Sequence, residues 1–199
     1  MNPWWLIVAG VGLLVVSASI FEARRPSIGR VESDVFHAVN GLPDGLYALL
    51  WLPMQLGNLV VGTCAGLAVA LLDGDLAVAI GAIAAMVLKL VTERIVRKEM
   101  ADYLAVRQRP GTSQVGALLR GDVPVSGPSF PSGHVILVAA VACVVTPSLP
   151  IAWWWVPAVL TVLVMVGRVY VGAHNPLDVT AGLGTGLLLG GVLATVAAS

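Results

Sequence analysis

Six long apolar stretches divide this sequence, and they restrict its possible folds more than any other feature. A helix needs about 20 mainly apolar residues to cross the hydrocarbon core of a bilayer. Only 11% of the residues are charged, whereas soluble domains carry roughly 25%, so polar side chains are too few to cover a core in water. We therefore expect an all-α, multi-pass membrane protein, a bundle of six transmembrane helices in one domain over residues 1–199. The expected spans are about 4–20, 46–72, 76–96, 131–145, 151–171 and 176–197.

Two of the segments between these stretches are long enough to have structure of their own. Residues 27–44 are polar and place valines and Phe36 at helical spacing, which predicts a short amphipathic helix at the membrane surface. Residues 97–130 form the longest polar loop, and long loops in compact proteins are usually functional or disordered. In the last apolar stretch, Gly182, Gly186 and Gly190 recur every four residues, which indicates close helix packing rather than catalysis.

Charged residues are distributed unevenly about the expected membrane. The net charge is zero, which gives no support for a nucleic-acid partner. Every Lys and Arg falls in the loops or span ends of one side, and the other side offers only Asp73, Asp75 and the chain termini. The polar chemistry therefore gathers at one membrane face. The preference for Arg, Ala, Val and Gly is typical of a GC-rich bacterial genome, so we expect a bacterial cytoplasmic membrane.

Three short polar motifs meet at that face. They are VRQRPG at 106–111, PSGH at 131–134 and GRVYVGAHNPLD at 167–178. Ionisable residues at membrane depth are costly and therefore indicate function. Arginine binds phosphate oxygens bidentately, and a helix N-terminus adds free N–H groups and a positive dipole end. The motifs thus predict an oxyanion site at the level of the lipid headgroups.

The order and spacing of these motifs resemble the signature of the type-2 phosphatidic acid phosphatase superfamily, which includes vanadium haloperoxidases and glucose-6-phosphatase. The family pattern is Lys-x6-Arg-Pro, then Pro-Ser-Gly-His, then Ser-Arg-x5-His-x3-Asp. In this chain Arg109 precedes a proline, and Arg168, His174 and Asp178 keep the spacing of the third motif. The six expected spans also match the usual bacterial membrane form of the family.

Two positions depart from the family pattern. Gly167 precedes Arg168 where the family usually has serine, and Asp102 stands where it has the lysine. Lys98 lies one helical turn before Asp102 and would point the same way on a continuous helix. Either Lys98 or Arg107 is therefore the candidate to supply the missing positive charge.

The resemblance implies a role for most of the motif residues. His174 would attack phosphorus and form a phosphohistidine, while Asp178 would hold the other ring nitrogen. His134 would protonate the leaving group. The groups that would bind the phosphoryl oxygens are Arg109, Arg168, Ser132 and the Gly133 N–H, together with Lys98 or Arg107. The reaction would need no metal ion and no other cofactor.

The predicted function is hydrolysis of a phosphate monoester or pyrophosphate carried by a membrane lipid, such as phosphatidic acid, phosphatidylglycerophosphate or a polyprenyl phosphate. Two alternatives stay open: a catalytically inactive relative, and a non-enzymatic transporter or scaffold. A transporter would place its ionisable groups near the membrane midplane, whereas here they lie at span ends. Orientation also stays open, because the family usually places this site on the outer face while the positive-inside rule places the basic side in the cytoplasm.

Overall fold

The chain is a bundle of helices in the computed structural model, which describes residues 3–25, 27–99 and 107–197. The long helices are α1 (Pro3–Ala23), α4 (Leu59–Asp73), α5 (Leu76–Glu99), α7 (Gly133–Val145), α8 (Trp155–Tyr170) and α9 (Pro176–Ala197). The shorter ones are α2 (Arg30–Asn40), α3 (Tyr47–Met54) and α6 (Pro110–Ser113). No β-strand forms within these ranges, and the one isolated bridge joins Gln108 and Pro128. The prediction of an all-α protein is confirmed.

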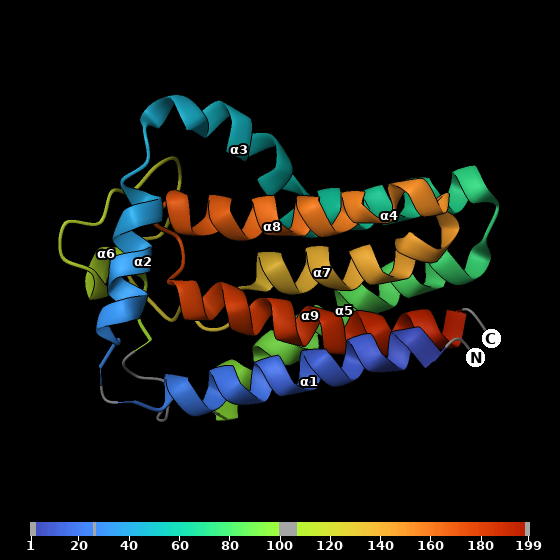
Figure 1. Cartoon of the computed structure of the whole chain (residues 1–199), viewed down its shortest axis with the longest axis horizontal. Helices are drawn as coiled ribbons and strands as arrows, with labels where there is room; N and C mark the ends of the chain where they lie inside the picture. Colours follow the sequence, from blue (N-terminus) through green and yellow to red (C-terminus); the bar gives the residue numbers. More distant parts are fainter. Residues whose placement is uncertain (1–2, 26, 100–106, 198–199) are drawn as a thin grey trace.

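The long helices run side by side, and α7 lies in the middle of them (Figure 1). All residues of α7 except His134 and Ala142 are buried, against α4, α5, α8 and α9. The glycines of α9 allow this close approach: a Cβ on Gly186 would lie 2.5 Å from the Ala139 Cβ. A Cβ on Gly190 would likewise lie 2.7 Å from the Ala140 Cα. The expected packing role of the glycine stripe is confirmed.

Four helical segments are long and apolar enough to cross a membrane. They are Pro3–Ala23, Leu76–Val96, Ile151–Tyr170 and Pro176–Ala197. A bent pair, Asp44–Gly57 with Leu59–Asp73, would make a fifth span, and Gly133–Ser148 is a shorter apolar helix. By length and composition the described residues therefore provide four to five spans.

The stretch expected as one span at 46–72 is broken near its middle. A 3-10 turn at Gln55–Gly57 and an extended Asn58 separate α3 from α4, and the two parts are bent by 74°. The Asn58 side chain accepts hydrogen bonds from the N–H groups of Val60 and Val61, at 3.0 and 3.4 Å, so it caps a new helix. Apolar composition alone predicted a continuous helix, but the Asn58 cap starts a second helix within this stretch.

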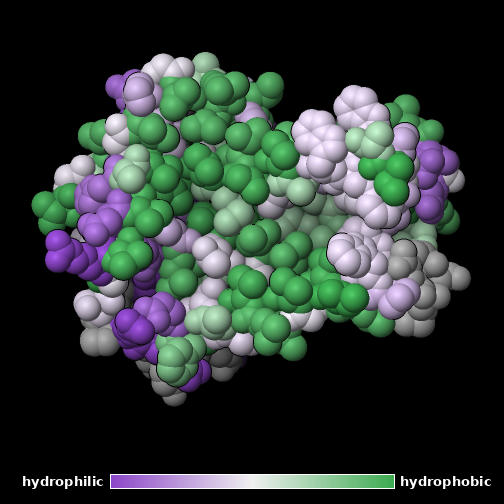
Figure 2. All heavy atoms as spheres, viewed as in Figure 1, coloured by the Kyte–Doolittle hydropathy of each residue, from purple (hydrophilic) through white to green (hydrophobic). Residues whose placement is uncertain are grey.

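The surface agrees with a membrane location. Apolar side chains cover the length of the bundle, and hydrophilic side chains gather mainly at the end that carries α2 (Figure 2). The helix expected at the membrane surface is present as α2, which lies across this end of the bundle (Figure 1). It buries Phe36 and Asn40, while Val31 is exposed. The chain is therefore a multi-pass membrane protein with its polar loops concentrated at one end.

Candidate active site

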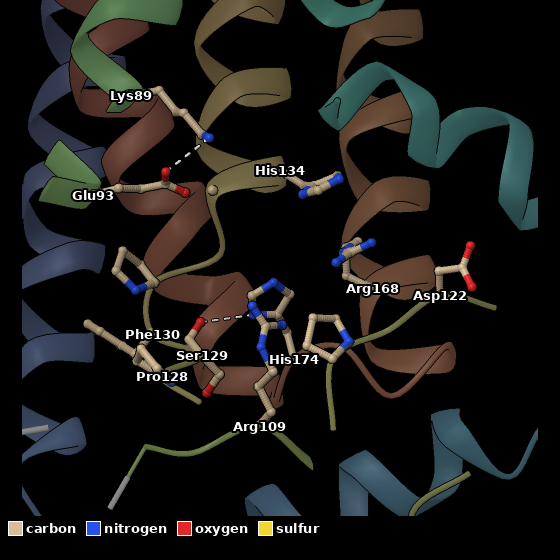
Figure 3. A pocket seen from close by; sticks show the side chains of 13 residues that line it. Lys89, Glu93, Arg109, Asp122, Pro128, Ser129, Phe130, His134, Arg168 and His174 are labelled. Atoms are coloured by element: carbon tan, nitrogen blue, oxygen red, sulfur yellow. Dashed lines mark hydrogen bonds and ion pairs between the residues drawn. The ribbon is translucent and has the colours of Figure 1, made fainter. Parts of the chain in front are cut away.

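A cavity of about 400 Å³ opens among the polar loops near α2. Its walls come from α5, from the loop that precedes α7, from the last turn of α8 and from the loop between α8 and α9. Figure 3 shows the side chains around it. The predicted site residues that line it together are Arg109, Gly133, His134, Arg168 and His174. Three motifs that lie far apart in the sequence thus form one site.

His174 lies in the loop between α8 and α9, and a backbone carbonyl holds its ring. The Nδ1 atom is 2.9 Å from the carbonyl oxygen of Ser129, a contact drawn in Figure 3. Asp178, which we expected to hold this nitrogen, is farther away, with its Oδ2 at 3.9 Å. A carbonyl oxygen only accepts hydrogen bonds, so Nδ1 carries the hydrogen and Nε2 keeps its lone pair.

The surroundings of His174 keep its imidazole neutral. Burial lowers its pKa well below the usual value, and the positive charges of Arg168 and Arg109 lower it further, as does His134. The hydrogen bond to Ser129 opposes this shift but does not cancel it. A neutral imidazole with a free Nε2 is the form that can attack an electrophile.

Asp178 belongs to a buried network with Arg107. One oxygen of Asp178 lies 2.8 Å from Arg107 Nη2, and the other accepts the Asn175 N–H at 2.8 Å. Arg107 also makes a bidentate pair with Glu32 of α2, at 2.9 and 2.6 Å. Burial would lower the pKa of Arg107, but the two carboxylates outweigh it and raise the pKa above its ordinary value. Arg107, a predicted phosphate ligand, thus binds two carboxylates and does not line the cavity.

Buried polar atoms without a partner point to a ligand site. Three buried polar atoms have no hydrogen-bond partner among the described residues: Arg168 Nε, Ser132 Oγ and Arg107 Nε. Buried polar groups are nearly always hydrogen-bonded, and of these three residues Arg168 lines the cavity, so it is the one best suited to an incoming oxyanion. Arg109 also lines the cavity and donates from Nη1 to the Ala173 carbonyl at 3.0 Å. Ser132 itself lies behind the wall, just before Gly133.

The break between α3 and α4 positions His134. A Cβ on Gly57 would lie 2.6 Å from the His134 Cβ and 2.9 Å from its Cδ2, so only glycine leaves room for the ring. His134 stands in the first turn of α7 and lines the cavity. The 3-10 turn at Gln55–Gly57 therefore packs directly against the His134 side chain.

Of the two departures from the family pattern, Gly167 and Asp102, the structure describes the surroundings of Gly167. A Cβ on Gly167 would lie 2.6 Å from Met54 Cγ and 2.8 Å from its Sδ, so glycine accommodates α3 and does not line the cavity. Asp102 lies outside the described residues. Lys98 is exposed near the end of α5 and is not among the residues that line the cavity.

Sequence reasoning missed three ionisable residues of the cavity wall, which are Asp122, Lys89 and Glu93. Lys89 and Glu93 form an ion pair at 3.0 Å. Their signal was present, because two charges four residues apart within an expected span are costly in a membrane. Glu32 was missed as well, since nothing local in the sequence connects it to Arg107. Among the described residues, no group of three or more His, Cys, Asp or Glu is placed to hold a metal ion.

Comparisons with known proteins identify the family of this chain. Residues 75–198 match the model of the PAP2 superfamily. An undecaprenyl-diphosphatase from Sulfolobus acidocaldarius is 37% identical over 89 residues. That match covers 44% of this chain and 42% of the relative, so the similarity spans less than half of either protein.

Two solved structures share the fold. The crystal structure of Aquifex aeolicus LpxE superposes with a TM-score of 0.63 and 19% identity, covering 83% of this chain and 93% of that one. The first transmembrane PAP2 type phosphatidylglycerolphosphate phosphatase from Bacillus subtilis superposes with a TM-score of 0.66 and 22% identity, covering 96% and 94%. At these identities the likeness shows a common fold.

Proposed function

The chain belongs to the PAP2 superfamily, and from this premise we propose that it is a membrane lipid phosphatase that hydrolyses a phosphate monoester or pyrophosphate of a lipid. The observation that carries the proposal is the geometry of His174. Its Nδ1 is bound by the Ser129 carbonyl, and its side chain lines a cavity shared with Arg109 and Arg168. The curated relative is named as a diphosphatase of a polyprenyl lipid, which supports this substrate class.

In the proposed reaction, His174 Nε2 attacks phosphorus and the bond from phosphorus to the leaving oxygen breaks. His134 donates a proton to that oxygen, so the lipid alcohol or lipid phosphate leaves in its protonated form. Water then attacks the phosphohistidine, and His134 takes up the proton that the water releases. Inorganic phosphate departs, and both histidines return to their starting forms.

The cations of the cavity would stabilise the transition state. Arg109, Arg168 and the N–H of Gly133, which line the cavity, would bind the phosphoryl oxygens, and the unpartnered Oγ of Ser132 would assist from behind the wall. Removing one such donor typically lowers the rate about 100-fold or more. Asp178 acts indirectly in this scheme, because it anchors the loop that carries His174 through the Asn175 N–H. The scheme assigns every step to side chains of this chain and therefore needs no metal ion.

The membrane arrangement follows from the same proposal. We count the buried helix α7 as a short central span and the bent pair α3–α4 as another, which gives six spans in one domain over residues 1–199. A short span suits α7, because its N-terminus would end at headgroup depth, where the lipid phosphate lies. We place the protein in a bacterial cytoplasmic membrane, with lipid phosphates as its substrates.

Phosphate release from a panel of lipid phosphates tests this function directly. Detergent-purified wild type and His174→Ala are compared with EDTA present, and Arg94→Gln serves as an exposed control on α5. Release that persists in EDTA and disappears in His174→Ala is expected, and the preferred lipid identifies the substrate. Release that survives His174→Ala would refute the assigned nucleophile. A folded wild type that releases phosphate from no lipid would favour an inactive relative.

A further inference from the structure

Two ionisable side chains of α5 face the cavity without belonging to any of the three motifs. Lys89 Nζ lies 3.0 Å from Glu93 Oε2, and the two side chains are only 13% and 16% exposed. Both line the cavity together with His134 and Arg168 (Figure 3). Charges held within an apolar span carry a desolvation cost, so their retention indicates a functional role.

The carboxylate of Glu93 occupies the place directly beside the start of α7. A Cβ built on Gly133 would overlap Glu93 Oε1 and would lie 2.8 Å from Lys89 Cε. α7 begins at Gly133, and the N–H groups of a first helical turn have no partner within the helix. These groups and the positive end of the helix dipole favour an anion at this place. The anionic group found beside them is the Glu93 carboxylate.

We propose that the Glu93 carboxylate and the phosphate of the substrate compete for this place, and that Lys89 pairs with whichever of them occupies it. The inference rests on the proposed function, because the phosphate concerned is that of the lipid substrate. The glutamate side chain changes between staggered rotamers, so it can move aside while Lys89 remains. Lys89 then joins Arg109 and Arg168 as a third cation of the phosphate site.

This exchange predicts effects of opposite sign for the two partners. Lys89→Met removes a cation from the bound phosphate, so the Kd for inorganic phosphate should rise at least about tenfold and kcat/KM should fall about 100-fold. Glu93→Gln removes the competing charge and keeps the side-chain shape, so the Kd for phosphate should fall about tenfold. An ion pair that served only stability would make both variants less stable and would not strengthen phosphate binding in either.

Isothermal titration of the full chain in detergent with inorganic phosphate measures these affinities without requiring hydrolysis. The variants are Lys89→Met, Lys89→Arg, Glu93→Gln and the double variant Lys89→Met/Glu93→Gln, with thermal unfolding to check folding. Arg94→Gln is the matched control, because it removes one exposed charge from the same helix. Lys98→Met tests the lysine that the sequence analysis proposed as a replacement for the missing family lysine. Lys89→Arg keeps the charge and should retain most of the affinity.

Weaker phosphate binding in Lys89→Met, together with tighter binding in Glu93→Gln, would support the exchange. Unchanged affinity in a folded Lys89→Met, or an equal loss in Lys98→Met, would overturn it. If Lys89→Met fails to fold, Glu93→Gln decides alone, since unchanged or weaker phosphate binding there contradicts competition. These affinity shifts in a protein that hydrolyses no lipid would support the exchange while refuting the proposed function.

Discussion

Asp178→Asn distinguishes two ways in which a carboxylate can support a catalytic histidine. Where the carboxylate fixes the tautomer of the histidine, as in serine proteases, its conversion to an amide lowers kcat about 10⁴-fold. Here the Ser129 carbonyl already holds Nδ1 at 2.9 Å, and Asp178 lies 3.9 Å away. The amide should therefore leave the tautomer unchanged, and only the negative charge is lost.

The size of the loss follows from the distances. The positive charge that develops on His174 during attack would form 3.9 Å from Asp178 Oδ2. Two unit charges about 4 Å apart interact by about 4 kcal/mol at an effective dielectric constant of about 20. Arg107, 2.8 Å from the same carboxylate, offsets part of that field. We therefore expect kcat to fall about 100-fold, which corresponds to about 2.7 kcal/mol in the barrier.

The assay measures initial phosphate release and the acid-quenched phosphoenzyme for wild type and Asp178→Asn in the same detergent. Thermal unfolding shows that both proteins are folded, and Glu32→Gln is the matched control, because it neutralises the carboxylate on the opposite side of Arg107. The control should lose less activity than Asp178→Asn, since the Glu32 carboxylate accepts hydrogen bonds from Arg107 and from the Leu177 N–H rather than facing His174. A 10⁴-fold loss in a folded Asp178→Asn would refute the reasoning and show that Asp178 fixes the tautomer.

Three further predictions concern packing and pH. Gly167→Ser, which restores the usual family residue, should destabilise the protein by about 1–3 kcal/mol because its Cβ would meet Met54; a Tm in detergent equal to that of wild type would contradict this. Gly186→Val should reduce the free energy of unfolding by a similar amount and lower the Tm. Gly10→Ala, with open space around its Cβ, should leave the Tm unchanged. Because burial and two neighbouring arginines lower the pKa of His174, an NMR titration should find its ring neutral at about pH 6, where an ordinary histidine is largely protonated. The unfolded chain takes up that proton first, so the free energy of unfolding should fall as the pH drops below about 6.5.

The helices and the main cluster of site residues follow from local features of the sequence. The bounds of α9, Pro176–Ala197, are those expected from the apolar run and its first proline. The spacing of Arg168 and His174 places one at the end of α8 and the other in the next loop, and both line one cavity. Such predictions succeed because the length of an apolar run and the spacing of residues a few positions apart determine local structure without contacts from distant segments.

Features that depend on contacts between distant segments were not predictable in this way. The break at Gln55–Gly57 lies in an apolar run, and its shape depends on Gly57 packing against His134. The carboxylate of Asp178 is four residues from His174, which suggested a direct hydrogen bond, yet the Ser129 carbonyl is closer. That carbonyl reaches the ring because a loop 45 residues earlier in the chain folds back beside it.

The main-chain carbonyl that holds His174, the proposed nucleophile, has an evolutionary consequence. Every amino acid carries that carbonyl, so residue 129 can change its side chain and still orient the imidazole, provided that the path of the backbone is kept. The Ser129 N–H donates to the Arg107 carbonyl at 3.0 Å, which helps to hold that path. The tautomer of His174 thus depends on the backbone path of the loop and not on the residue type at position 129. A search for sequence motifs therefore does not detect this interaction.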